Sequence, residues 1–305
     1  MTEGVKKEEK QHFSVSMPFS RIIRYVFETI FAYILYGFFW VLPMAWASNL
    51  GGFIMRNIGP HLGASRKTLQ NISKAYPKET YSHHKNILVG MWDNIGRVIG
   101  EFPHIRGVKK GENIEIVGEE NIKSFQNGKN PAIFIGGHIG NWEVQTKALS
   151  FLGINPLFVY RKPNNPWVDS LLHYAREKTQ DDMVAKGHEG ARELVSALKK
   201  GRPLGMLIDQ KLNEGLSIPF FGRPAMTAPA AAKFALKFDC PLMPIRVERI
   251  KGSQFRVTFY PPLKINKTKD GKKDIEETLK TINQTLEDWI RERPEQWLWL
   301  HKRWS

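Results

Sequence analysis

The sequence has a single cysteine, Cys240, among its 305 residues. One thiol cannot form an intramolecular disulfide, and it excludes four-cysteine zinc sites and iron–sulfur clusters held within one chain. Acidic side chains are also scarce, since 45 Lys and Arg stand against 30 Asp and Glu, which gives a net charge of +15. This excess predicts an anionic partner, which could be phospholipid, nucleic acid or an acidic protein. The hydrophobic fraction of 42% is typical of a globular protein.

No charged side chain and no histidine occurs between Thr29 and Met55. This run of 27 residues is long enough to cross a bilayer, since a spanning helix needs about 20 apolar residues. Its Tyr and Trp side chains favour the headgroup level. Pro43 and the Gly51-Gly52 pair can break the helix, so we expect either a spanning helix or one that dips into a single leaflet. A buried core helix and a signal peptide cleaved at Ala45-Trp46-Ala47 are the alternatives.

Basic side chains are concentrated directly after the apolar run. Residues 56–110 contain ten Lys or Arg and three acids, a surplus of seven, whereas residues 1–28 contain five basic and four acidic side chains. The positive-inside tendency places the chain after the run in the cytoplasm, and the basic block would hold it against anionic lipid. We predict a polar arm over residues 1–20, a membrane anchor over 21–57 and a single α/β domain over 58–305, whose part 58–110 is basic and helical.

Short apolar runs alternate with helical patterns beyond residue 111. Such alternation predicts an α/β fold, with a central, mostly parallel or mixed sheet flanked by helices. Residues 64–105 are also expected to be helical, with a break at Pro77. The expected strands are Ala132–Gly136, Leu157–Tyr160, Leu204–Asp209, Pro244–Glu248 and Phe255–Tyr260. The expected helices are Trp142–Phe151, Trp167–Lys178, Gly190–Lys199, Ala228–Phe238 and Asp274–Arg291.

The segment with the clearest chemical pattern is Ile133–Glu143, which reads IFIGGHIGNWE. An apolar strand ends in two glycines, His138 follows, and Glu143 lies in the first turn of the next expected helix, where the two side chains can meet. A histidine held by a carboxylate is the arrangement of general-base catalysis. No G-x-S-x-G nucleophile motif lies nearby, so we expect His138 to activate a hydroxyl of the substrate. A strand-end histidine that is only hydrogen-bonded is the structural alternative.

Three further segments complete the pattern. Tyr160-Arg161-Lys162-Pro163 ends one expected strand, Asp209-Gln210 ends another ahead of IPFFG at 218–222, and residues 294–304 read PEQWLWLHKRW. Together with the apolar run and GGHIGNWE, these segments cover essentially the whole chain. In this order they resemble the late acyltransferases of lipid A biosynthesis (lauroyl/myristoyl type), which belong to the lysophospholipid acyltransferase-like superfamily with its H-x4-D/E motif.

The resemblance implies an acyltransferase whose α/β domain lies on the cytoplasmic face of the inner membrane. Such enzymes take a fatty acyl group from acyl carrier protein, without a further cofactor. They place it on a hydroxyl of a phosphorylated glucosamine lipid. The resemblance also implies that His138 is the general base and Glu143 its orienting acid.

The roles of the other candidate residues stay open. Arg161 could bind an acceptor phosphate or stabilise the oxyanion, and Asn141 could supply an oxyanion donor or cap the following helix. Asp209 and Gln210 are expected to line the same cleft, although Asp209 could equally be the ion-pair partner of Arg161. His301 is expected to be structural. No third metal ligand occurs at a familiar spacing from the GGHIGNWE segment, so no metal is predicted.

The identity of the acceptor is the main open alternative. The motifs fit an acyltransferase for a lysophospholipid or another glycolipid equally well. A membrane-tethered nucleic-acid-binding protein would also use the net charge of +15, but we find no helix-turn-helix, RNP or KH signature. The expected partners are therefore acyl carrier protein, a phosphorylated glycolipid and an anionic membrane, and no nucleic acid.

Overall fold

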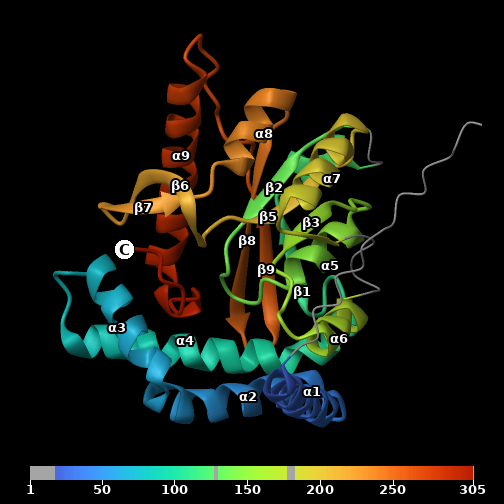
Figure 1. Ribbon diagram of the computed structural model, residues 1–305, viewed down its shortest axis with the longest axis vertical. Helices are drawn as coiled ribbons and strands as arrows, with labels where there is room; N and C mark the ends of the chain where they lie inside the picture. Colours follow the sequence, from blue (N-terminus) through green and yellow to red (C-terminus); the bar gives the residue numbers. More distant parts are fainter. Residues whose placement is uncertain (1–17, 127–129, 177–182, 305) are drawn as a thin grey trace, which may run out of the picture.

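A computed structural model describes residues 18–126, 130–176 and 183–304, and every structural statement below refers to these residues. Most of the polar arm predicted over residues 1–20 lies outside this range, as does the end of the helix expected over Trp167–Lys178. Figure 1 shows a twisted central sheet with helices on both faces and a layer of helices, α2 (Met44–Ile58), α3 (Gly63–Ala75) and α4 (Tyr81–Glu101), along one end. The predicted α/β class is confirmed.

The central sheet has seven strands in the order β1-β9-β8-β2-β5-β3-β4. Five of the six neighbouring pairs are parallel, and β8 and β9 are antiparallel, so the prediction of a mostly parallel or mixed sheet is confirmed. The strands are β1 Ile114–Val117, β2 Ile133–Gly136, β3 Leu157–Tyr160, β4 Met183–Ala185, β5 Leu204–Leu207, β8 Leu242–Lys251 and β9 Gln254–Phe259. A separate antiparallel hairpin consists of β6 (Lys211–Phe220) and β7 (Arg223–Thr227).

The helices expected beyond residue 111 are all present, with starts that differ by at most three residues. They are α5 Val144–Phe151, α6 Pro166–Arg176, α7 His188–Lys199, α8 Ala230–Phe238 and α9 Gly271–Glu292. Ahead of them, α3 (Gly63–Ala75) and α4 (Tyr81–Glu101) flank the expected break at Pro77. Short 3₁₀ segments follow several of these elements: η1 Gly59–His61, η2 Phe102–Gly107, η3 Glu119–Phe125 and η4 Pro294–Gln296.

The sheet is buried on both faces. Ile133 and Ile135 of β2 belong to a core that α3, α4, α7, α8 and α9 complete, whereas Phe134 belongs to a second core with α5 and η3. Successive side chains of a strand point to opposite faces, which explains this division. A strand that is covered on both sides must be apolar throughout, and this is why β2 could be recognised as an uninterrupted apolar run.

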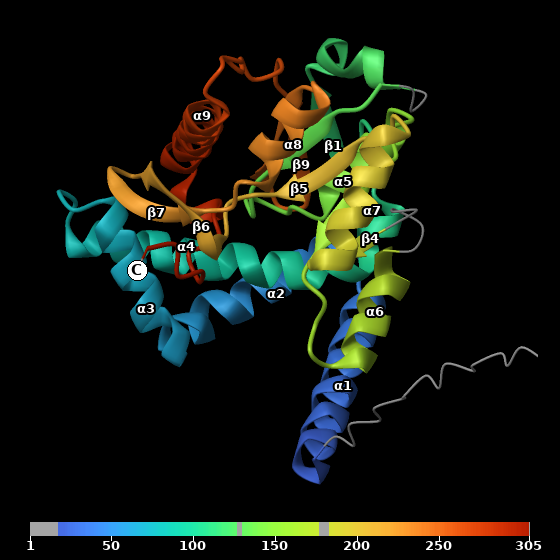
Figure 2. The same ribbon diagram turned by 45° about the horizontal axis from the view of Figure 1, so that its top comes forward.

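The uncharged run is divided between two helices. α1 spans Phe19–Trp40, α2 spans Met44–Ile58, and Pro43 precedes the first turn of α2. α1 projects from the body of the molecule beside α6 (Figure 2) and exposes apolar side chains, among them Phe31 and Ile34 at 66% each. By length and composition α1 could cross a membrane. The expected break at Pro43 is confirmed, whereas Gly51 and Gly52 lie inside α2 and do not interrupt it.

The glycines of α2 instead allow it to pack closely on α4. A Cβ atom added to Gly51 would lie within 3.0 Å of the carbonyl oxygen of Gly96 on α4. A Cβ atom added to Gly100 of α4 would likewise lie within 3.0 Å of the carbonyl oxygen of Ala47 on α2. Figures 1 and 2 show the two helices running side by side. The second half of the predicted anchor therefore packs against the helical part of the domain.

A buried ion pair joins this helical layer to the sheet. Glu101, at the end of α4, is fully buried, and both of its carboxylate oxygens bind the guanidinium of Arg249 on β8, with 2.9 Å between Nη2 and Oε2. The hydroxyl of Ser48 on α2 donates to Glu101 at 2.6 Å, and the side-chain amide of Asn141 donates to it at 2.7 Å. One carboxylate thus contacts α2, β8 and the segment that follows His138.

Gly96→Ala is expected to lower the free energy of unfolding by about 1–3 kcal/mol, because its methyl group would overlap the backbone of Gly51. Gly63→Ala is the matched control, since a Cβ atom at this helical position meets nothing within 4 Å. Unfolding of both variants would be followed in detergent. Equal stability of Gly96→Ala and the wild type would contradict backbone contact between α2 and α4.

Candidate active site

Two parallel neighbours, β2 and β5, bring His138 and Asp209 together. Gly136 is level with Leu207 in their register, and His138 and Asp209 each lie two residues further along the chain. Nδ1 of His138 is 2.8 Å from Oδ1 of Asp209, and the backbone N–H of His138 donates to Oδ2 at 2.8 Å. The carboxylate therefore fixes both the ring and the backbone of the histidine.

The environment of Asp209 keeps its carboxylate ionised. Burial by itself would raise the pKa of Asp209, but the charge and hydrogen bonds of His138 and the indole N–H of Trp297, which donates at 2.7 Å, hold it well below its usual range. An ionised carboxylate can only accept hydrogen bonds, so Nδ1 of His138 carries the proton and Nε2 keeps a lone pair. The side-chain nitrogen of Gln210 lies 3.3 Å from this Nε2. His138 can thus accept a proton at Nε2, as a general base must.

The contact that was expected between His138 and Glu143 is not formed. Glu143 directly precedes α5, is nearly buried, and binds the guanidinium of Arg176 on α6, with 2.8 Å between Nε and Oε2. Arg176 offers this carboxylate two parallel N–H groups, whereas Nδ1 of His138 is already bound by Asp209. The orienting carboxylate in the structure is therefore Asp209. The alternative in which Asp209 pairs with Arg161 is not observed either, because its oxygens bind His138 and Trp297.

Asn141 lies three residues ahead of α5 and does not line the pocket. Its residue is fully buried, its Nδ2 donates to Glu101, and its Oδ1 accepts the backbone N–H of Glu143 at 3.2 Å. The N-cap residue of α5 is Glu143, without a side-chain cap bond, so Asn141 closes a turn ahead of the helix. The structure therefore forms neither of the two alternatives for Asn141, because the residue is not the helix cap and its Nδ2 is bound to Glu101 instead of serving as an oxyanion donor.

A pocket of about 510 Å³ opens beside His138. Arg161, Gln210 and Glu143 line it, whereas Asp209 lies behind the histidine. Much of the wall is apolar and comes from β3, β5, α6, α7 and α8: Phe158, Met206, Leu172, Leu194, Ala231 and Phe234. Lys186 and Lys211 also line the pocket, and the one acid among the described lining residues, Glu143, is bound to Arg176.

The C-terminal tail completes the site, and its contribution was missed from the sequence. The backbone N–H of Leu298 donates to the carbonyl oxygen of His138 at 3.1 Å, and the N–H of Gly140 donates to Gln296 at 3.0 Å. Trp297 is buried and reaches Asp209, and His301, which was expected to be structural, lines the pocket. Trp297, Trp299 and Trp304 are all buried, and three tryptophans within eight residues were an available signal that the tail packs into the core.

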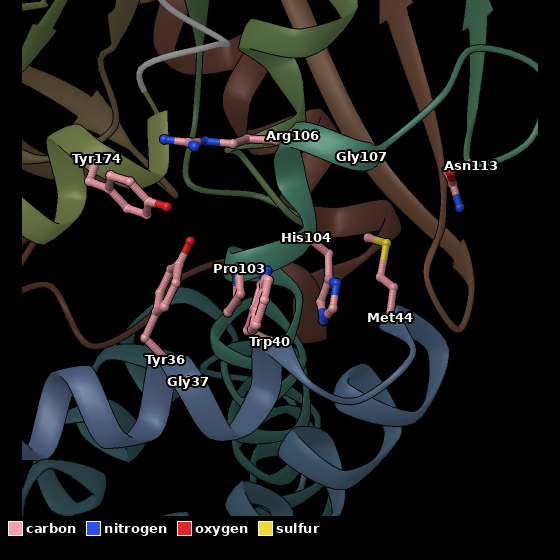
Figure 3. A pocket seen from close by; sticks show the side chains of 10 residues that line it. All are labelled: Tyr36, Gly37, Trp40, Met44, Pro103, His104, Arg106, Gly107, Asn113 and Tyr174. Atoms are coloured by element: carbon pink, nitrogen blue, oxygen red, sulfur yellow. The ribbon is translucent and has the colours of Figure 1, made fainter.

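A second cavity, of about 520 Å³, lies where α1 meets η2 and α6. Figure 3 shows Tyr36 and Trp40 of α1 around it, with Tyr174 of α6 and Arg106 of η2. None of the predicted site residues lines this cavity. It belongs to the junction between the exposed helix and the domain, and the pocket beside His138 remains the candidate active site.

Residues 16–305 match the model of the bacterial lipid A biosynthesis acyltransferase family. The chain belongs to this family. The lipid A biosynthesis lauroyltransferase of Escherichia coli K12 is 24% identical over 248 residues, which cover 77% of each chain. The palmitoleoyltransferase of the same strain is 24% identical over 247 residues, and a lipid A biosynthesis acyltransferase of Haemophilus influenzae is 23% identical over 240 residues, or 75% of this chain and 72% of the relative. The resemblance seen in the sequence is confirmed, and the protein is an acyltransferase of this family.

Asp209→Asn is expected to lower kcat of the acyltransferase by about 10²- to 10⁴-fold, because an amide can hold His138 in the wrong tautomer. Glu143→Gln is expected to act through Arg176 and to lower the unfolding temperature as well, since it leaves a largely buried guanidinium without its carboxylate. Both variants would be compared in kcat and in thermal unfolding. A greater loss of kcat in Glu143→Gln, at unchanged stability, would contradict the assignment of Asp209 as the orienting acid.

Proposed function

We propose that this acyltransferase moves a fatty acyl chain from acyl carrier protein to a hydroxyl of a phosphorylated lipid A precursor. His138 is the general base in this proposal, and Asp209 orients it. The observation that carries the proposal is the His138–Asp209 pair, which opens on a pocket with apolar walls and basic side chains.

The chemistry at His138 follows from the state of its ring. Nε2 takes the proton of the acceptor hydroxyl while the hydroxyl oxygen attacks the thioester carbonyl, and Asp209 stabilises the imidazolium that forms. The tetrahedral intermediate then collapses, the C–S bond breaks, and the leaving thiolate receives the proton from Nε2. Gln210 lies where the acceptor hydroxyl must approach, so its amide N–H is free to bind the developing oxyanion once the acceptor displaces it.

The apolar wall of the pocket supports a fatty acyl chain as the transferred group. Side chains such as Phe158, Leu194 and Met206 can remove methylene groups from water, and each buried methylene contributes about 0.8 kcal/mol. The reacting carbonyl would then lie at the polar end, where His138, Gln210 and Arg161 line the pocket. This arrangement supports a long-chain donor better than a short one.

Acyl carrier protein is proposed as the donor because the chain is strongly basic. A net charge of +15, together with Arg161, Lys186 and Lys211 around the pocket, suits an acidic carrier. The same charges suit a phosphorylated acceptor and an anionic membrane surface.

Membrane association is proposed through α1. Its exposed apolar side chains would lie in lipid, and the basic residues between 56 and 110 favour the cytoplasmic face of the inner membrane. In this arrangement the cavity in Figure 3, with its two Tyr and one Trp at the base of α1, would lie near the headgroups.

The test of the proposed function is mass spectrometry of the lipid formed from acyl carrier protein loaded with chains of several lengths and from candidate acceptors. We expect an acylated, phosphorylated glucosamine lipid, and a rate that His138→Ala lowers by about 10²- to 10⁴-fold. Acyl-coenzyme A would be offered in parallel. Equal use of both donors would contradict the carrier, acylation of a lysophospholipid alone would contradict the acceptor, and near-native turnover of His138→Ala would contradict the base.

Placement of α1 in lipid predicts that a double substitution, Phe31→Lys and Ile34→Lys, weakens membrane binding. A lysine at the centre of a membrane helix costs about 2.5–3.5 kcal/mol, and both sites are exposed, so the fold should persist. Ile250→Lys, at an exposed apolar site on β8, is the control. Membranes would be washed in high salt and the released protein measured. Retention of the double variant as firmly as the wild type would exclude α1 as the anchor.

A further inference from the structure

His301 lines the same pocket as His138, although it comes from the C-terminal tail. Its position is fixed by Asn71 of α3, whose side-chain amide donates to the carbonyl oxygens of His301 at 2.8 Å and Trp299 at 3.0 Å. Nε2 of His301 is buried and has no hydrogen-bond partner among the described residues. Burial of a polar atom without a partner costs free energy. The base chemistry proposed for His138 leaves this imidazole unused.

Burial and the positive charges around His301 favour its neutral form by lowering its pKa. Burial is the main cause that lowers its pKa; Asp209 acts in the opposite direction, and the positive charges of His138, Arg161 and Arg303 lower it further. Arg303 is fully buried and donates to neutral acceptors on Met226, Thr227 and Asn283. A second positive charge on His301 would therefore be unfavourable until an anion enters the pocket.

Arg161 is the available cation beside His301. It follows β3, is exposed, lines the pocket, and has no hydrogen-bond or ion-pair partner among the described residues. A guanidinium offers parallel N–H groups that match two oxygens of a phosphate. A doubly charged phosphate needs a second positive group, which a protonated imidazole supplies.

We propose that His301 and Arg161 form a phosphate-binding subsite at the polar end of the pocket, and that His301 takes up a proton when a phosphate group binds there. This inference rests on the proposed function and specifies how its site binds substrate. The ligand chemistry is a phosphate ester, and the proposed reaction offers two sources. One is the phosphate of the glycolipid acceptor, a monoester that carries up to two negative charges, and the other is the singly charged phosphodiester of the carrier's pantetheine arm.

The direction of the pH dependence follows from linkage. An anion beside His301 favours the imidazolium, so the ligand raises the pH at which the ring titrates. By reciprocity, the phosphate binds more tightly where His301 is protonated and loses affinity as pH rises through the titration of the bound form. The affinity for the phosphate changes by about tenfold for each unit by which the phosphate raises the pKa of His301. Protonation also gives both ring nitrogens an N–H, and the positive charge of the ring attracts an anion in the pocket that His301 lines.

The test is NMR of the nine histidines in the detergent-solubilised full chain, titrated between about pH 5.5 and 8. The probes are glucosamine 1-phosphate for the acceptor and holo-acyl carrier protein for the donor. The His301 signal is assigned by its loss in His301→Gln. We expect the probe to raise the pH at which His301 titrates. Arg161→Gln, a change of an exposed side chain, should remove that increase. His61→Gln, at an exposed site on η1, should retain it.

An increase in the pH at which His301 titrates, seen with only one probe, supports the subsite and identifies the source of the phosphate. An unchanged titration at saturating concentrations of both probes, or an equal rise in Arg161→Gln, overturns the inference. The measurement does not depend on acyl transfer. A protein that binds glucosamine 1-phosphate with proton uptake but fails in the acylation assay would contradict the proposed function alone.

Discussion

The buried carboxylate of Glu101 is the constraint on which most of the architecture depends. It accepts hydrogen bonds from Ser48 on α2, Asn141 after β2 and Arg249 on β8, so three parts of the molecule share one charge. Removal of one partner from a buried ion pair typically costs about 3–5 kcal/mol, because the other charge is left uncompensated. The close packing of α2 on α4 keeps Ser48 at this point. The helices near α1 and the segment that carries His138 are therefore held as one unit.

His138 is fixed from two sides because of this arrangement. On one side Asn141 is bound to Glu101, and on the other the tail pairs with the backbone of His138 and Gly140. Gly140 has a φ of +59°, which lets the chain turn between these two attachments. These attachments fix the backbone of His138, and Asp209 fixes the ring as well, because it contacts both Nδ1 and the backbone N–H. Such preorganisation lets a base act without a rearrangement that would slow the reaction.

The sequence could predict those features that depend on local pattern. β2 and the helices were recognisable from apolar runs and helical spacing, and His138 from its place after a strand. The partner of His138 could not be predicted in this way, because Glu143 is near in sequence whereas Asp209 becomes near only through the strand order. The strands β1 and β4 lie at the two edges of the sheet and have one buried residue each, so neither forms an uninterrupted buried apolar run like that of β2. Gly51 illustrates a different limit, since a glycine that breaks a helix and one that admits a neighbouring backbone look the same in sequence.

The distribution of charge explains why Asp209, rather than Glu143, suits the orienting role in the proposed mechanism. Glu143 is neutralised by Arg176 at close range, so it has little attraction left for a transient imidazolium. Among the described residues no permanent cation is hydrogen-bonded to Asp209, and the positive charge of Arg303 acts on it without a hydrogen bond. Burial lowers the pKa of Arg303 to about 10, so it stays charged at neutral pH. Asp209 can therefore stabilise the imidazolium that His138 forms in the proposed mechanism. In that mechanism the acceptor hydroxyl gives its proton to Nε2, and the leaving thiolate takes it from Nε2 in the same turnover.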